Sequence, residues 1–297
     1  MNKCILTATL FLFFLSVSAM GNNPIIADGA KLTKVAEGFA FTEGPAVDSK
    51  GNVYFTDQPN DRILKWTPDG KISFFFEGGR CNGLYFDKNG DLLACADNEN
   101  ELWRIRPNGT YSVLVKDYNG HKLNGPNDVW ESPQGFIYFT DPLYARDYWK
   151  HRTRERQQEG EYVYLLLSKQ NVLKPVATDL RKPNGIIGTP DGKYLYVADI
   201  GARKTYKYDI QKDGTLANKR LFAENGSDGM TIDEDGNIYL TGNGVIVYNP
   251  QGEQIEHIKV DASWTANVTF GGKDRKTLFI TASNAVYTLR MNVAGVK

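Results

Sequence analysis

The sequence predicts an all-β protein, a six-bladed β-propeller with four antiparallel strands in each blade. Three observations predict it: one hairpin pattern recurs six times, further short strands lie between its copies, and no long stretch has helical periodicity. Two hairpins per repeat supply the four strands of one propeller blade. Hydrophobic residues make up 41% of the 297-residue chain, which is enough for a packed core.

Each copy of the repeated hairpin is a short apolar run, a turn of the Asp-x-x-Gly kind, and a run rich in β-branched and aromatic residues. The copy that begins at Leu123 reads LNGPNDVWESPQGFIYFTD. The residues at the turn position of the six copies are Gly51, Gly90, Gly135, Gly192, Gly236 and Arg275. Neighbouring turn residues lie 39 to 57 residues apart, and a repeat of this length is typical of propeller blades.

The two ends of the chain predict how the ring closes. The sixth unit stops near Arg290 without an outer strand, while residues 31–37, KLTKVAE, form a strand candidate that has no blade of its own. Pairing this N-terminal strand onto the last blade closes the ring and removes an exposed edge. Residues 20–297 are therefore expected to form one propeller domain.

Residues 1–19 have the pattern of a secretory signal peptide. Lys3 precedes an apolar run from Ile5 to Leu15, and the small residues Val17 and Ala19 follow it. This run is too short to span a bilayer comfortably, and no other stretch is long and apolar enough to do so. The expectation is an exported protein, periplasmic or extracellular, with no membrane association after signal removal.

The charge balance argues against nucleic acid as a partner. Lys plus Arg and Asp plus Glu both count 35, so the formal net charge is zero. Nucleic-acid-binding proteins normally carry a basic stripe. The oligomeric state stays open.

Two cysteines remain beyond the signal, Cys81 and Cys95, and they fall on the two strands of one predicted hairpin. A disulfide is conceivable, and two buried thiols that pack as small apolar groups are an equal alternative.

One position in the repeat carries an oxygen-bearing side chain in every copy. It lies eight residues before each turn residue, at the head of the innermost strand, and it should face the central channel. Its occupants are Glu43, Asn82, Asn127, Asn184, Asp228 and Asn267. Asn and Asp favour such strand-entering turns for local reasons, but that preference does not account for six in six.

A ring of oxygen donors around a narrow axis suits a hard cation. Calcium takes six to eight oxygen ligands from carboxylates, amides and water. Glu43 and Asp228 carry the only charges in this ring, and two negative charges match one divalent ion. The ring contains no His or Cys.

The motifs EGPAVD from Glu43, PNDV from Pro126, KPNGI from Lys182 and SDGM from Ser227, in this order, resemble the gluconolactonase, senescence marker protein and luciferin-regenerating-enzyme family. The resemblance runs from residue 31 to the C-terminus. It implies a divalent metal in the channel, calcium in the first place, with Mg²⁺, Mn²⁺ or Zn²⁺ as possible substitutes. The ligands that it implies are Glu43, Asn127, Asn184 and Asp228. Whether Asn127 binds the metal or the substrate beside it stays open.

The resemblance also implies a reaction, the metal-dependent hydrolysis of a lactone such as gluconolactone to the aldonic acid. In this reading the metal polarises the carbonyl group and Asp228 activates water as the catalytic base. Asn82, Asp199 and Asn267 are expected to support this site from a second layer.

The longest connection in the chain, residues 142–161, should open on the same face as the ring, because it follows a second strand that ends at Asp141. Long connections without strand pattern are usually functional or mobile. This one is rich in aromatic and basic side chains that suit a sugar-like lactone. The substrate-binding candidates are Asn127, Asp141, Tyr144, Arg146 and Trp149.

Two alternatives remain. A propeller can be a non-catalytic binding module stabilised by a metal, for ligands or for proteins. The family resemblance also admits hydrolysis of phosphoester-like compounds. A serine hydrolase is disfavoured, because the chain contains no G-x-S-x-G motif.

Overall fold

The computed structural model describes residues 24–150 and 153–296, and within them it forms six four-stranded antiparallel sheets. The predicted six-bladed β-propeller is confirmed. The predicted signal peptide, residues 1–19, lies outside the described residues.

The blades follow the chain in order, each built from its innermost to its outermost strand. Blade 1 contains β2 (Thr42–Val47), β3 (Val53–Asp57), β4 (Arg62–Trp66) and β5 (Ile72–Glu77). Blade 2 contains β6 (Cys81–Phe86), β7 (Leu92–Ala96), β8 (Glu101–Ile105) and β9 (Tyr111–Val115). Blade 3 contains β10 (Val129–Glu131), β11 (Ile137–Asp141), β12 (Tyr162–Leu167) and β13 (Val172–Ala177).

The second half of the ring repeats this pattern. Blade 4 contains β14 (Pro183–Gly188), β15 (Tyr194–Asp199), β16 (Lys204–Ile210) and β17 (Leu216–Ala223). Blade 5 contains β18 (Met230–Ile232), β19 (Ile238–Gly242), β20 (Gly244–Tyr248) and β21 (Gln254–Ile258). Blade 6 contains β22 (Thr265–Gly271), β23 (Thr277–Ala282) and β24 (Ala285–Arg290), and its fourth strand is β1 (Thr33–Glu37).

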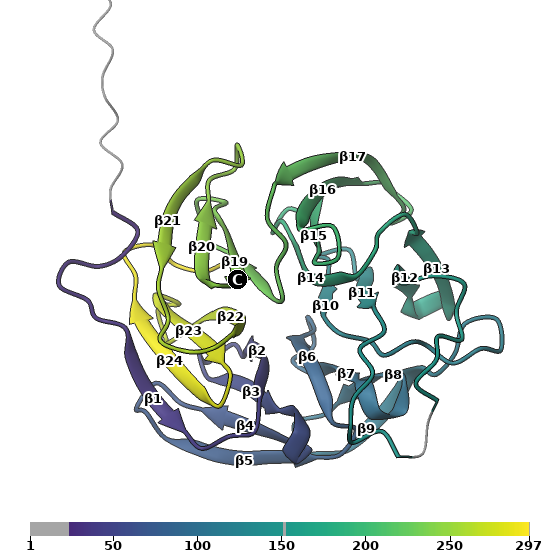
Figure 1. Ribbon diagram of the computed structural model, residues 1–297, viewed down its shortest axis with the longest axis horizontal. Helices are drawn as coiled ribbons and strands as arrows, with labels where there is room; N and C mark the ends of the chain where they lie inside the picture. The colour runs from purple at the N-terminus through teal and green to yellow at the C-terminus, as the bar shows by residue number, and fades with distance from the viewer. Residues whose placement is uncertain (1–23, 151–152, 297) are drawn as a thin grey trace, which may run out of the picture.

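The ring closes through β1, as predicted. β1 pairs with β24 in antiparallel register from Thr33 opposite Thr288 to Glu37 opposite Ala285, and Figure 1 shows it on the outside of the yellow blade. The closure is reinforced at the channel, where the Thr42 hydroxyl donates to the Ala285 carbonyl at 2.9 Å. Covering the edge of β24 in this way leaves its backbone groups paired.

Side chains from adjacent sheets interlock between the blades. Phe55 of blade 1 and Phe279 of blade 6 have ring centroids 5.5 Å apart, and the Trp130 ring of blade 3 lies so close to Gly188 of blade 4 that a Cβ there would collide with it. Such close packing holds each blade at a fixed angle to the next.

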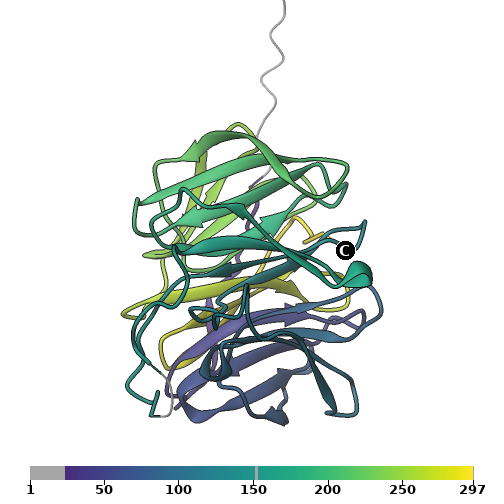
Figure 2. The ribbon, with the colours of Figure 1, turned by 90° about the vertical axis from the view of Figure 1, so that its right-hand side faces the viewer.

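The propeller has two distinct faces. The inner strands begin at one face, where the second strands β3, β7, β11 and β15 end. The Asp-x-x-Gly turns lie at the opposite face, and the C-terminal residues lie beside them, since the Gly295 amide donates to the Arg275 carbonyl at 2.9 Å. Figure 2 shows the propeller from the side. Residues 24–150 and 153–296 also contain three 3₁₀ turns, η1 (Gln58–Asn60), η2 (Asp97–Glu99) and η3 (Ser168–Gln170). None of the helical turns in the described part of the chain has the length and apolar character needed to cross a bilayer.

The two cysteines of blade 2 do not form a disulfide. Cys81 and Cys95 are both buried and free, and Cys81 lies opposite Ala96 rather than Cys95. They pack as small apolar side chains.

Candidate active site

Four of the six oxygen-bearing residues lie in inner strands with an irregular start, and the other two, Asn127 and Asp228, lie two residues before β10 and β18. In β2, Glu43 pairs with Thr56 but the next pair is Ala46 with Tyr54, so β2 has one extra residue there. The same one-residue bulge occurs at the heads of β6 and β14, and one occurs in β22 before Asn267. A bulge re-aims the side chains around it and interrupts the ladder, which lets side chains converge on the channel axis.

Threonines one residue before the end of second strands hold these irregular segments. The Thr56 hydroxyl donates to the Asn82 carbonyl at 3.2 Å, and the Thr281 hydroxyl donates to the Asn267 carbonyl at the same distance. The Thr140 hydroxyl accepts from the Asp128 amide at 3.1 Å. Side-chain bonds therefore replace ladder bonds where the bulges remove them.

In blades 1, 3 and 4 an aspartate at the end of the second strand holds the segment that leads into the inner strand. Asp141 is fully buried, and its carboxylate accepts from the amides of Asn124 at 2.9 Å and Gly125 at 2.8 Å. The sequence prediction made Asp141 a substrate contact. The structure instead places it beneath the rim, where its oxygens are engaged by backbone amides.

Asp199 has the same position in blade 4. It is 2% exposed and accepts from the amides of Arg181 and Lys182, each at 2.9 Å. It thus supports the segment that delivers Asn184 to the channel, and its influence on the ring runs through the backbone.

One side of the ring is organised by Asn267. Its side-chain amide donates to Glu43 Oε2 at 3.2 Å and to the two carboxylate oxygens of Asp128 at 3.3 and 3.2 Å. Glu43 is 3% exposed and Asp128 is 8% exposed. A single amide therefore bridges two buried carboxyl groups from blades 1 and 3.

Asp128 is a site residue that the eight-residue spacing missed. It follows Asn127, and in a regular strand consecutive side chains point to opposite faces. The sequence did contain one indication of its role: in four other blades the residue after the oxygen-bearing one is glycine, so a charged side chain at this position is unusual within the repeat. The side chain of Asp128 lies against Gly83, where a Cβ would collide with it.

The other side of the ring is organised by Asp228. Its Oδ1 accepts from the Asn184 side-chain amide at 2.8 Å, and its Oδ2 accepts from the indole nitrogen of Trp264 at 2.5 Å. The Asn184 amide also donates to the hydroxyl of Tyr144 at 3.1 Å. Trp264, a second residue absent from the sequence prediction, thus contacts the predicted base directly.

Three carboxyl groups converge electrostatically in this ring. Burial raises the pKa of Glu43 well above the usual carboxyl range, and the charges of Asp228 and Asp128 raise it further. The pKa of Asp128 is raised well above its usual range by burial and then by Asp228. Burial also raises the pKa of Asp228, against the hydrogen bonds from Trp264 and Asn184. Buried carboxylates this close together repel one another, so the cluster is stabilised when one carboxyl group is protonated or when a cation binds between them.

The donor set fits a hard divalent cation. Two amide oxygens of the ring, Asn82 Oδ1 and Asn184 Oδ1, are buried without a hydrogen-bond partner among the described residues. Buried polar atoms without partners are uncommon and cost free energy. The described residues contain no group of three or more His, Cys, Asp or Glu side chains set to hold a metal ion together, so the fit rests on carboxylate and amide oxygens combined.

Asn127 is 4% exposed, and its backbone places it beside the ring. Its carbonyl accepts from the Gly83 amide at 2.7 Å, and its amide donates to the Thr140 carbonyl at 2.9 Å. Whether its side chain binds metal or substrate stays a prediction.

Residues 142–150, which we call the rim segment, fold across blade 2 and are fastened there by Asp97. Asp97 Oδ2 accepts from the Tyr148 hydroxyl at 2.9 Å and from the Trp149 indole nitrogen at 3.1 Å, and Arg146 Nε lies 3.9 Å from it. Trp149 is 4% exposed. The sequence prediction placed Trp149 against the substrate, whereas the structure makes it an anchor of the rim segment.

Tyr144 and Arg146 are the rim-segment residues that reach toward the ring. The guanidinium of Arg146 lies 5.2 Å from the centroid of the Tyr144 ring, and the ammonium of Lys182 lies 4.7 Å from it. Arg146 also lowers the pKa of Asp228 by its charge, in opposition to burial. These two residues add a cationic and aromatic wall beside the carboxylates.

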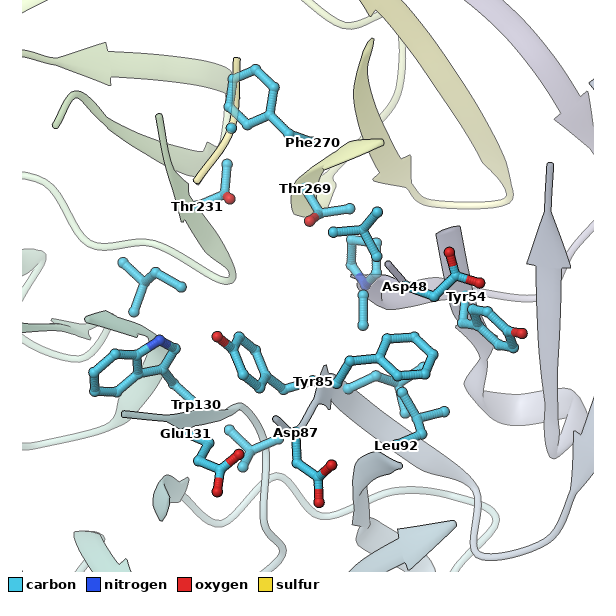
Figure 3. A pocket seen from close by; sticks show the side chains of 18 of the residues that line it. Asp48, Tyr54, Tyr85, Asp87, Leu92, Trp130, Glu131, Thr231, Thr269 and Phe270 are labelled. Carbon is cyan, nitrogen blue, oxygen red and sulfur yellow. The ribbon is translucent and has the colours of Figure 1, made fainter. Parts of the chain in front are cut away.

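Below the ring the channel widens toward the turn face. A cavity of about 850 Å³ there includes Asp128 and Asn267 in its lining, but none of the other oxygen-bearing residues of the ring. Figure 3 shows Tyr85 and Trp130 close together in its wall, with Thr231 and Thr269 on the other side of the opening. Asn267, a member of the ring, and its hydrogen-bond partner Asp128 thus lie where the ring meets this cavity.

The fold and the ring define a class, the six-bladed propellers that carry a mixed carboxylate and amide site at one end of the channel. The chain belongs to one family within it, since residues 41–284 match the SMP-30/Gluconolactonase/LRE-like region.

Individual relatives agree with this membership. A gluconolactonase of Zymomonas mobilis is 28% identical over 293 residues, covering 88% of this chain and 81% of that protein. The solved structure of XC5397 from Xanthomonas campestris, described as a gluconolactonase, superposes with a TM-score of 0.81 at 26% identity and covers 90% and 91% of the two chains. A calcium-binding protein, regucalcin, from Agrobacterium tumefaciens shares the fold, with a TM-score of 0.76 at 18% identity over 90% of this chain and 96% of its own. Family and relatives together support a lactone hydrolase.

Proposed function

We propose that this protein hydrolyses a sugar-type lactone, such as gluconolactone, to the open-chain acid, and that the reaction depends on a divalent cation, calcium in the first place. The observation that carries the proposal is the convergence of Glu43, Asp128 and Asp228 at the channel mouth, beside amide oxygens that have no hydrogen-bond partner among the described residues. The names of the relatives support the lactone as the substrate class.

Glu43, Asn184 and Asp228 would hold the cation, with Asn127 beside them as a further ligand or as a substrate contact. When bound, the cation supplies positive charge to the carbonyl oxygen of the lactone, where negative charge develops. The oxygen ligands suit calcium better than a softer metal.

Asp228 is the group proposed to accept a proton from the attacking water. The water oxygen forms a bond to the carbonyl carbon, the bond from that carbon to the ring oxygen breaks, and the ring oxygen receives a proton as it becomes a hydroxyl group. Asn184 and Trp264 each donate to one Asp228 oxygen, which orients the carboxylate. Tyr144 and Arg146 would orient the hydroxyl groups of the substrate.

The decisive experiment is a pH-stat assay with glucono-δ-lactone, corrected for spontaneous hydrolysis, on metal-depleted protein and after addition of Ca²⁺, Mg²⁺, Mn²⁺ or Zn²⁺. We expect activity only with added cation, and a loss of at least 100-fold in Asp228→Asn. Asp274→Asn, at a surface ion pair with Arg290, is the matched control and should keep full activity.

Parallel assays test the alternatives. Cation binding measured by calorimetry without turnover of any lactone would favour a non-catalytic binding propeller. Turnover of a phosphotriester in place of lactones would favour the phosphoester alternative.

Export is the second part of the proposal, on the pattern of residues 1–19. Expression of the full chain with its N-terminus intact, followed by fractionation and N-terminal sequencing, should recover a protein shortened near residue 19 outside the cytoplasm. A full-length protein in the cytoplasmic fraction would contradict it.

A further inference from the structure

Trp264 differs from every other tryptophan of the chain. The other four are 3 to 5% exposed, whereas Trp264 is 41% exposed. A large aromatic side chain left in solvent gives up burial free energy that the others gain. It stands at the channel mouth, two residues from Ala266 and three from Asn267.

The backbone of Trp264 is held firmly although its ring is exposed. Its amide donates to the Ser283 hydroxyl at 3.0 Å, and that hydroxyl donates to the Trp264 carbonyl at 3.0 Å. One part of the ring lies over Gly242 of blade 5, where a Cβ would sit 3.7 Å from it, an ordinary contact distance. The indole is therefore a fixed surface rather than a mobile side chain.

The exposed ring is joined to the predicted base. Its nitrogen donates to Asp228 Oδ2 at 2.5 Å, while Asn184 donates to Oδ1 at 2.8 Å. Because the Asn184 amide also reaches the Tyr144 hydroxyl at 3.1 Å, two aromatic residues flank the pair formed by Asp228 and Asn184. When water activated by Asp228 attacks the carbonyl carbon of a lactone, the rest of the lactone ring must lie beside Trp264 and Tyr144.

We propose that Trp264 is both a positioning residue for Asp228 and the stacking platform for the ring of the lactone. Its N–H holds the carboxylate in one orientation, and its exposed face receives the face of a cyclic ester that carries carbon-bound hydrogens. The platform selects five- and six-membered sugar-type lactones over open-chain esters, which present no such face. This inference rests on the proposed lactonase function and deepens it.

Two variants separate the two functions. Trp264→Phe keeps an aromatic face but removes the N–H, and we expect kcat to fall about 10- to 100-fold, because a misoriented base loses rate steeply, while KM changes little. Trp264→Ala removes both the N–H and the aromatic face, so in addition to the loss of kcat the KM for the lactone should rise about 3- to 10-fold. An open-chain ester such as methyl gluconate should lose kcat in both variants without the additional KM effect.

A binding measurement makes the test independent of turnover. Gluconolactam, a ring amide analogue, should change the intrinsic tryptophan fluorescence of the calcium-loaded wild-type protein, and Trp264→Phe should abolish that change. Phe74→Ala, an exposed aromatic residue on the outer strand β5, is the control and should retain both the fluorescence response and the kinetic constants. Thermal unfolding of each variant verifies that the fold persists.

The outcomes distinguish this inference from the proposed function. A fluorescence response that survives in Trp264→Phe, or kinetic constants in both variants equal to those of the wild type, would overturn the role of Trp264 while leaving lactonase activity in place. A wild-type protein that binds gluconolactam through Trp264 but hydrolyses no lactone would refute the proposed function alone. Absence of any response in the wild type would refute the platform.

Discussion

The substitution Asn267→Leu tests how Asn267 stabilises the buried carboxyl groups of Glu43 and Asp128. It keeps the approximate size of the side chain and removes its amide. The Asn267 amide donates to Glu43 and Asp128 at 3.2 to 3.3 Å. A hydrogen bond contributes roughly 0.5 to 1.5 kcal/mol between neutral groups and roughly 1.5 to 3 kcal/mol when one group is charged. Because the pKa values of Glu43 and Asp128 are raised, about 1.5 kcal/mol per bond, where the two ranges meet, is the appropriate value. Two such bonds give an expected loss of about 3 kcal/mol in the free energy of unfolding of the metal-depleted protein.

The assay is urea unfolding of metal-depleted and calcium-loaded protein, followed by tryptophan fluorescence. Calcium should narrow the gap between the variant and the wild type, because a cation held by Glu43 compensates the charge that Asn267 otherwise stabilises. The matched control is Asn237→Leu, since Asn237 is also buried and donates to one carboxylate oxygen of Asp233 at 2.8 Å, away from the ring. Its loss of stability should be the same with and without calcium.

A loss below about 0.5 kcal/mol in metal-depleted Asn267→Leu would contradict the bridging role of Asn267, because such a value is typical of surface substitutions that touch no network. A loss that calcium leaves unchanged would refute the link between Asn267 and the cation site.

Three further predictions concern packing, the rim segment and pH. Gly188→Ala places a Cβ against the Trp130 ring and should cost about 1 to 3 kcal/mol in urea unfolding, a loss that a smaller residue at 130 should partly restore. Asp97→Asn weakens the anchor of Trp149, so we expect faster tryptic cleavage within the rim segment and a KM raised roughly 10-fold, with thermal stability nearly unchanged; unchanged cleavage would contradict the anchor. The pKa of Asp274 is lowered to about 2, chiefly by the hydrogen bond from its arginine partner, so its ion pair contributes stability above pH 4 that is lost as the pH falls toward 2. Because the pair is exposed, Asp274→Asn should lower unfolding free energy at pH 7 by no more than about 1 kcal/mol, and a gap between variant and wild type that widens below pH 3 would reverse the sign.

Sequence periodicity was sufficient for the fold because each blade is a local unit. In five of the six sheets the strands are consecutive along the chain, so their pairing follows from turn residues such as Gly135 and Gly192 and from alternating side chains. The closing strand was also predictable, because residues 31–37 had no other edge to pair with.

The same periodicity located six oxygen-bearing residues but misjudged their neighbours. Counting from the turn assumes a regular strand, and the bulges at the heads of the inner strands break that assumption. Asp128 lies before β10, where both it and Asn127 form backbone hydrogen bonds with Thr140, so its side chain does not follow the alternation of a regular strand. Asp141 and Trp149 looked like open rim residues in sequence, yet both are engaged in buried hydrogen bonds.

The repeat spacing and the two end segments of the chain were therefore enough to predict the number of blades, the closing strand and the family, and to propose a ring of oxygen donors. The bridge from Asn267 to Glu43 and Asp128, the fastening of the rim segment to blade 2 and the hydrogen bond from Trp264 to Asp228 appear only in the folded chain. The physical reason is that strand patterns record contacts within one blade, whereas these contacts join side chains from different blades and from irregular loops. Their geometry depends on how the blades are set around the axis, which no local spacing encodes.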